Sequence, residues 1–155
     1  MTAWILSLLI AAVPPGLTPR ETEADAIVRY VGIAEDAAAV AAGPEEGALI
    51  AAIAVHESRL DLAVDQGLVR GDGAVCLMQL QHPPPGAESD RRICFAEGLR
   101  LARQSLGACR ALPIRERLAS YCSGRCELGR VRSREIVDIW QRLLWAHPFP
   151  SRARS

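Results

Sequence analysis

Apolar residues recur along most of this chain at the three- and four-residue spacing of helix faces. One stripe consists of Ile50, Ile53, Ala54 and Glu57, within a segment that we expect to be helical from residue 44 to about residue 59. This stripe places Glu57 on a face that should be buried. The same spacing predicts four further helices, at 18–42, 89–106, 113–121 and 133–146.

Capping residues support these helix boundaries. The expected starts are the capping box Thr18-Pro19-Arg20-Glu21, Ser89 or Asp90, Pro113 and Ser133. The residues expected to face inward are Ile93, Ala96, Leu99, Ala102 and Leu106 in the third helix, and Ile136, Val137, Trp140, Leu143 and Leu144 in the fifth. The fifth helix should end before His147-Pro148.

A glycine-rich stretch separates the second and third predicted helices. Residues 61–81 alternate enough in polarity to predict a small β-hairpin. The Pro83-Pro84-Pro85-Gly86 loop follows it. The expected fold class is therefore mostly α, with about five helices and this small β region, an α+β arrangement. The pattern alone also allows an ordinary helical bundle.

The two ends of the chain differ from its centre. Residues 1–17 contain an apolar run, Trp4 to Val13, of signal-peptide length. We interpret this run as an export signal, with a buried first segment as the alternative, because no basic residue precedes it. Residues 18–147 fit one domain, and residues 148–155 read as a basic tail. We expect no membrane-spanning helix, because no apolar run reaches 18 residues.

The five cysteines favour an oxidising compartment. An odd count leaves at least one thiol unpaired within the chain. Cys94 and Cys109 should lie about 20 Å apart on one helix, too far to pair. We expect Cys76 to pair with Cys94, and Cys109 to pair with Cys122 or Cys126. No cysteine or histidine spacing indicates zinc, so we expect neither a metal nor another cofactor.

Charge is distributed unevenly along the chain. Residues 1–75 hold four Arg and eleven acidic residues, giving −7, whereas residues 76–155 hold fourteen Arg and seven acidic residues, giving +7. A basic half can attract an anionic polymer, such as cell-wall material or nucleic acid. No recognition-helix or RNA-binding signature is present, so we do not expect nucleic acid as a partner.

Three short motifs occur in an order that suggests a function. They are His56-Glu57-Ser58, then Gly73-Ala74-Val75-Cys76-Leu77-Met78-Gln79-Leu80, then Tyr121-Cys122-Ser123-Gly124. Over residues 45–145 the chain resembles the lytic transglycosylases (SLT-type domain) of the lysozyme-like superfamily, which show Glu-Ser, Gly-Leu-Met-Gln and Tyr-Asn-x-Gly at these places. The resemblance implies a lysozyme-like fold with the glycine-rich region beside an active-site cleft.

The resemblance also implies a reaction and residue roles. Glu57 would protonate the bond between N-acetylmuramic acid and N-acetylglucosamine in peptidoglycan, then act as base while a 1,6-anhydro ring closes. Apolar surroundings disfavour a charged carboxylate, which suits such an acid. Ser58 would position the glutamate or the substrate, and Met78 would contact a sugar face. Gln79 would bind the N-acetyl group or shape the groove, and Tyr121 would direct its hydroxyl at Glu57.

Each supporting residue also has a plainer interpretation. Ser58 can bond a backbone carbonyl at the helix end, Met78 can fill the core, and Tyr121 can be a half-buried aromatic. His56 lies about 100° around the helix from Glu57, so we give it no catalytic role.

Two departures from the family pattern concern cysteines. Cys76 stands where the family has glycine, so we expect the loop to differ locally, because cysteine lacks glycine's backbone freedom. Cys122 stands where the family has asparagine, which removes an amide.

Two other functions remain open. A lysozyme-type hydrolase would use Asp61, Asp65 or Asp72 to activate water, although each reads more simply as a turn residue. A catalytically inactive relative would bind glycan or a partner without turnover. The expected location is periplasmic, secreted or phage-encoded, with secretion, conjugation or phage machinery as a possible setting.

Overall fold

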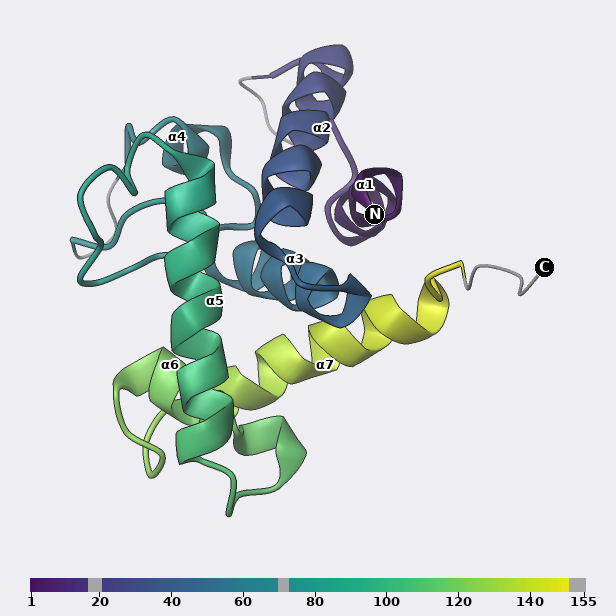
Figure 1. Ribbon diagram of the computed structural model, residues 1–155. Helices are drawn as coiled ribbons and strands as arrows, with labels where there is room; N and C mark the ends of the chain where they lie inside the picture. The colour runs from purple at the N-terminus through teal and green to yellow at the C-terminus, as the bar shows by residue number, and fades with distance from the viewer. Residues whose placement is uncertain (17–20, 70–72, 151–155) are drawn as a thin grey trace.

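The computed structural model describes residues 1–16, 21–69 and 73–150, and this part of the chain is mostly helical (Figure 1). Its elements are α1 (Thr2–Ala12), α2 (Glu23–Val40), α3 (Pro44–Ser58), α4 (Leu62–Asp65), α5 (Arg91–Ala108), the 3-10 turn η1 (Ile114–Glu116), α6 (Ala119–Ser123) and α7 (Arg130–Ala146). No helix in these ranges has both the length and the apolar character needed to cross a membrane.

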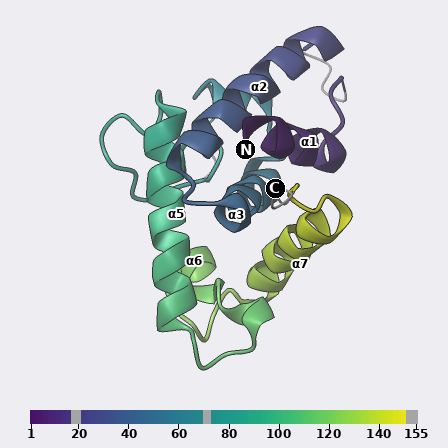
Figure 2. The same ribbon diagram turned by 45° about the vertical axis from the view of Figure 1, so that its right-hand side comes forward.

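Helix α3 forms the centre of the fold. Helices α1, α2, α5 and α7 all pack against it, as the two views in Figures 1 and 2 show. Every residue from Gly47 to Ala54 is buried, including the predicted Ile50, Ile53 and Ala54. A helix that is apolar on all sides is expected inside a fold. Small residues let its neighbours approach closely, since a Cβ on Gly47 would lie 2.9 Å from Ile5 Cδ1.

The apolar N-terminal run lies inside the core as helix α1. Ile5 and Leu8 are fully buried between α2 and α3. The Trp4 indole donates to the His147 carbonyl over 2.7 Å, and its ring meets Phe149 edge-on. In this structure the run is therefore a buried first segment, which is the alternative interpretation given above. The export signal stays a prediction. Of the expected basic tail, residues 151–155 lie outside the described part.

One helix start differs from the expected one and another agrees with it. Helix α2 begins at Glu23, where the Thr22 hydroxyl accepts the Asp25 N–H over 3.1 Å. Thr22 and Asp25 repeat the hydroxyl–acid spacing expected at Thr18 and Glu21. The predicted cap at Thr18 lies outside the described residues. Helix α5 uses Asp90, one of its two predicted caps.

The buried face of α5 is rotated from the predicted one. Leu99 and Ala102 are buried as expected, but Ala96 is exposed. Cys94 and Phe95 are buried instead, because Cys94 is bonded to Cys76 and the Phe95 ring fills the core.

The C-terminal helices also differ from the prediction. The expected helix 113–121 is divided into η1 and α6. Ser133 does not cap α7, which begins three residues earlier after Gly129. The buried Ser133 hydroxyl donates to the Arg115 carbonyl over 2.9 Å and accepts the Leu118 N–H over 3.0 Å. It therefore joins α7 to the η1–α6 segment. Helix α7 ends before His147, as predicted.

The predicted β-hairpin is not seen among the described residues. The Asp61 carboxylate accepts the N–H groups of Ala63 and Val64 and thereby starts the short helix α4. Beyond residues 70–72, which lie outside the described part, Val75 and Leu80 form one antiparallel bridge. The described parts of this segment are therefore a helical turn and a closed loop rather than a ladder of strands.

Two disulfides hold the outer segments. Cys76 bonds Cys94, as predicted, and Cys109 bonds Cys126, one of its two predicted partners. All five cysteines lie in the described ranges, and Cys122 keeps a free thiol.

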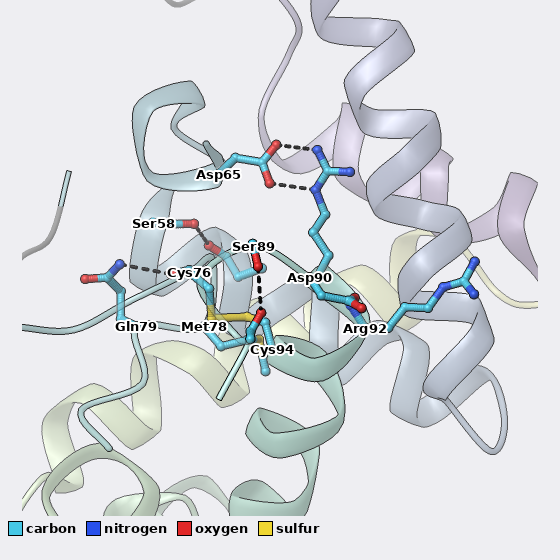
Figure 3. The surroundings of a disulfide bond; sticks show 12 residues. Ser58, Asp65, Cys76, Met78, Gln79, Ser89, Asp90, Arg92 and Cys94 are labelled. Carbon is cyan, nitrogen blue, oxygen red and sulfur yellow. Dashed lines mark hydrogen bonds and ion pairs between the residues drawn. A yellow bond between two sulfur atoms is a disulfide. The ribbon is translucent and has the colours of Figure 1, made fainter. Parts of the chain in front are cut away.

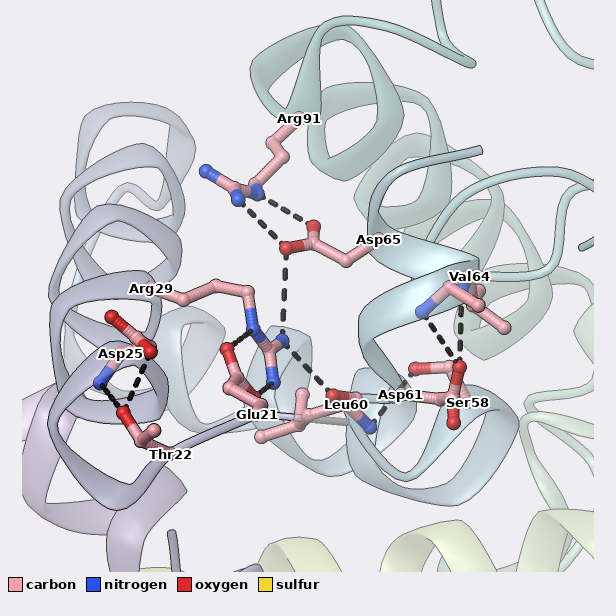
Figure 4. A network of polar contacts seen from close by, with 11 residues as sticks. Glu21, Thr22, Asp25, Arg29, Ser58, Leu60, Asp61, Val64, Asp65 and Arg91 are labelled. Atoms are coloured by element: carbon pink, nitrogen blue, oxygen red, sulfur yellow. Dashed lines mark hydrogen bonds and ion pairs between the residues drawn. The ribbon is translucent and has the colours of Figure 1, made fainter. Parts of the chain in front are cut away.

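A buried ion network links α2, α4 and α5 (Figure 4). Arg91 makes two hydrogen bonds, of 2.6 and 2.7 Å, to the Asp65 carboxylate, whose side chain is 1% exposed. Arg29 lies 3.6 Å from the same carboxylate, pairs with Glu21 and donates to the Leu60 carbonyl over 2.9 Å. The network therefore fixes the chain just after α3.

Candidate active site

Glu57 lies in the last turn of α3, with its side chain 6% exposed. The sequence prediction that it occupies a buried face is confirmed. Arg59 and Leu60 adopt left-handed backbone with φ of 51° and 54°, so the chain turns sharply just after the glutamate. Leu60 is fully buried, which pins this turn against the core.

A cleft of about 760 Å³ opens beside Glu57. Met78, Gln79 and Tyr121 line it together with Glu57, although they come from three separated parts of the chain. Four of the five predicted site residues thus lie in one cleft, whose size is within the range of small-molecule sites. The cleft is also lined by Ala74, Glu97, Arg100, Cys122 and Arg132.

Ser58 is the predicted residue that does not line this cleft. Its hydroxyl donates to the Ala54 carbonyl over 2.7 Å and accepts the Leu60 N–H over 3.3 Å. Both contacts belong to the end of α3, so Ser58 has the plainer of its two expected roles.

The loop from Val75 to Leu80 forms one wall of the cleft. Hydrogen bonds of 3.1 and 3.0 Å join the backbones of these two residues and close the loop. Inside it, the Gln79 side chain donates to the Cys76 carbonyl over 3.0 Å (Figure 3). The Gln79 amide is therefore partly used in holding the loop that it belongs to.

Cys76 adopts the backbone conformation expected of glycine. Its φ is 59°, in the left-handed region, and the Gln79 N–H donates to its carbonyl over 3.0 Å. The expectation that cysteine could not supply this conformation is wrong. The side chain is bonded to Cys94 of α5, so surrounding structure holds a conformation that costs a non-glycine residue on the order of 1 kcal/mol.

Met78 packs into the core rather than into the open cleft. Its side chain is 1% exposed and lies against Gly98 of α5, where a Cβ would come within 2.4 Å of Met78 Cε. The absence of a side chain at Gly98 thus makes room for Met78 and positions the loop.

Gly98→Ala should therefore destabilise the protein by about 1–3 kcal/mol, because the added methyl group overpacks the contact with Met78. Gly107→Ala on the same helix is the matched control. A Cβ there has nothing within 4 Å, so the greater helix propensity of alanine should stabilise the protein by about 0.5–1 kcal/mol. Denaturant unfolding of both variants measures the difference, and equal shifts would contradict this packing.

Tyr121 supports the loop with its hydroxyl. The hydroxyl donates to the Met78 carbonyl over 2.9 Å, so the expectation that it points at Glu57 is not met. Burial, and after it the negative charge of Glu57, raises the pKa of Tyr121 well above its ordinary value. Tyr121 therefore keeps its proton near neutral pH and acts as a donor.

Three titratable residues to which the sequence analysis gave no role form a cluster with Glu57. Arg132 of α7 donates to Glu57 Oε2, and His56 Nδ1 lies 3.2 Å from Glu57 Oε1. On its other side, His56 Nε2 lies 3.0 Å from Glu135 Oε2. His56 thus contacts Glu57 despite the 100° between them on the helix, and its adjacency in sequence was the available signal. Arg132 is 75 residues away from Glu57, and no local pattern marks it.

His56 should titrate above its ordinary value of 6.5, because hydrogen bonds to Glu57 and then Glu135 outweigh its burial and raise its pKa. Its contribution to stability is then complete below about pH 6.5 and is lost as the pH rises through the raised pKa. NMR titration of the imidazole protons measures this directly. Glu135→Gln should lower the pKa of His56, and an unchanged pKa would contradict the contact.

The free thiol of Cys122 also faces the cleft. Burial, and after it the charge of Glu57, raises the pKa of Cys122 to about 12. A thiol that stays protonated is a poor nucleophile, so the site offers acid–base chemistry at Glu57 rather than thiolate chemistry.

Two of the loop aspartates are engaged elsewhere. Asp61 caps α4, and Asp65 is bonded to Arg91. Asp72 lies outside the described residues. Neither Asp61 nor Asp65 lines the cleft with Glu57.

Within 1–16, 21–69 and 73–150, no three His, Cys, Asp or Glu side chains converge as a metal site would require.

Comparisons with protein-family models, curated proteins and solved structures find no match to this chain.

Proposed function

We propose that this chain is a peptidoglycan lytic transglycosylase with a lysozyme-like fold. One observation carries the proposal: the cleft gathers the almost fully buried Glu57 with Met78, Gln79 and Tyr121, which the motif resemblance names. Chance proximity is a weaker explanation, because Glu57 and Tyr121 come from segments that are 64 residues apart.

In the proposed reaction Glu57 acts twice on the bond between N-acetylmuramic acid and N-acetylglucosamine. It first gives its proton to the bridging oxygen, which leaves with the N-acetylglucosamine part. The resulting carboxylate then takes the proton of the muramoyl 6-hydroxyl, whose oxygen closes onto C1. The proton on Glu57 is thereby restored, and no water is consumed.

The surroundings of Glu57 favour this single-carboxylate route over hydrolysis with Asp61 or Asp65. A hydrolase places a second carboxylate about 5–10 Å from the first. Asp61 and Asp65 have their oxygens bound in the α4 cap and the ion network. Tyr121 and Gln79 instead hold the loop opposite Glu57 in a fixed shape.

The natural setting proposed for this activity is the periplasm or the outside of a cell. Two disulfides fit an oxidising compartment, where peptidoglycan is also found. A wall-opening enzyme of this size would suit a secretion system, a conjugation system or a phage.

A second function, glycan binding without turnover, is favoured by one contact. Arg132 holds Glu57 as an ion pair, and a carboxylate in that state has no proton to donate. The cleft would then recognise a glycan strand without cutting it.

Digestion of purified peptidoglycan tests the proposal. Soluble muropeptides released by the protein should end in muramoyl residues that are lighter by one water than the reducing form. Co-sedimentation with peptidoglycan and no soluble product would instead establish the binding function.

A further inference from the structure

The ion pair between Glu57 and Arg132 conflicts with the first step of the proposed reaction. A general acid must carry a proton, yet the nearest charged neighbours of this carboxylate are a guanidinium and the imidazole of His56. Both favour the charged carboxylate. Departure of Arg132 to another partner would remove one of these two charges from Glu57.

Arg132 is well placed to change its partner. Its side chain is 50% exposed, in the first turn of α7, and lines the cleft. Glu57 is its one hydrogen-bond acceptor among the described residues. The other arginine of the cleft, Arg100, is held more firmly, because it makes two hydrogen bonds to Glu97 and a third to Gln104.

We propose that Arg132 binds a carboxylate carried by the glycan and thereby releases Glu57 from its ion pair. The incoming carboxylate replaces that of Glu57 on the guanidinium. This inference rests on the proposed function and adds a residue that selects an anionic substrate and couples its binding to the release of Glu57.

Peptidoglycan offers the required chemistry in two places. The lactyl group of N-acetylmuramic acid ends in a carboxylate when it carries no peptide, and a peptide stem carries carboxylates of its own. An arginine fork matches either of them with two parallel hydrogen bonds.

Calorimetric titration of the full chain tests the proposal without turnover. The ligand is the N-acetylglucosaminyl-N-acetylmuramic acid disaccharide. It has no muramoyl–glucosamine bond that the proposed reaction could cleave. Chitobiose, a disaccharide without a carboxylate, is the control ligand. We expect wild type at pH 7 to bind the acidic disaccharide about tenfold more tightly than chitobiose.

Three variants assign the effect. Arg132→Gln should bind both disaccharides equally. Glu57→Gln should bind the acidic one more tightly than wild type does, because Arg132 then has no carboxylate partner to leave. Arg134→Gln, also on α7 but paired with Glu116 and outside the cleft, should behave as wild type. A disaccharide that carries a dipeptide stem, compared in the same way, shows which carboxylate Arg132 prefers.

The outcomes separate this inference from the function on which it rests. Equal affinities for both ligands in wild type, or the loss of the preference in Arg134→Gln, would overturn the role of Arg132 while the transglycosylase proposal stands. Failure of wild type to bind either sugar would overturn both.

Discussion

Glu57→Gln should lower the rate of peptidoglycan cleavage by about a thousandfold while leaving the fold intact. The amide has nearly the shape of the carboxylate but can neither give nor take the proton in the proposed reaction. Positioned acid–base groups contribute about 10²- to 10⁴-fold to rates. The substitution also removes the charge that attracts Arg132 and His56, and both side chains reach the solvent. The rate of release of soluble muropeptides measures the effect.

Glu135→Gln is the matched control. Glu135 contacts the other side of His56, but its side chain is 57% exposed and does not line the cleft. Its loss should change the rate less than about tenfold, because it acts on Glu57 only through the imidazole. Equal losses in the two variants would show that the charge cluster matters as a whole and that Glu57 has no special role.

Asp65→Asn should destabilise the protein by about 3 kcal/mol. Asp65 is almost fully buried, and its carboxylate receives Arg91 through two hydrogen bonds and faces Arg29 (Figure 4). Removing one partner of a buried pair costs about 3–5 kcal/mol, because it leaves the other charge without compensation. The exposure of Arg91 to solvent places the expected loss at the lower end. Denaturant unfolding gives the value.

Asp138→Asn serves as the control for an exposed ion pair. Asp138 accepts a hydrogen bond of 2.8 Å from Arg115, and both side chains are about half exposed. Water screens such a pair, so the unfolding midpoint should not change measurably. A loss equal to that of Asp65→Asn would contradict the assignment of the network as a buried support of the loop after α3.

The helices that the sequence predicted best have both a clear apolar stripe and a clear signal at the helix start. Helix α3 begins at Pro44 and ends next to Glu57, as its apolar spacing and acidic first turn indicate. Helix α5 also lies where expected, but its buried face does not. The buried face is set by the Cys76–Cys94 disulfide and by the packing of Phe95, and neither contact is local in sequence.

The misplaced elements depend on tertiary hydrogen bonds. Ser133 resembles a cap in sequence, yet its hydroxyl serves two backbone groups of the η1–α6 segment. The predicted hairpin failed for a related reason. Asp61 favours a helical turn, and the left-handed conformations of Cys76 and Gln79 close a loop too tight for a strand ladder.

The candidate site was predictable as far as its motifs extend. Glu57, Met78, Gln79 and Tyr121 all reach the same cleft. The charges that control Glu57 were not predictable, because Arg132 meets it only through the packing of α7 on α3. The charge environment of Glu57 is therefore a property of the fold.

The central claim is tested most directly by the fate of solvent oxygen during cleavage. Peptidoglycan is digested by the protein in water enriched in heavy oxygen, and the released muropeptides are analysed by mass spectrometry. We expect 1,6-anhydromuramoyl ends that contain no solvent oxygen, and their absence with Glu57→Gln. Reducing muramoyl ends that each carry one heavy oxygen atom would show hydrolysis and would contradict it.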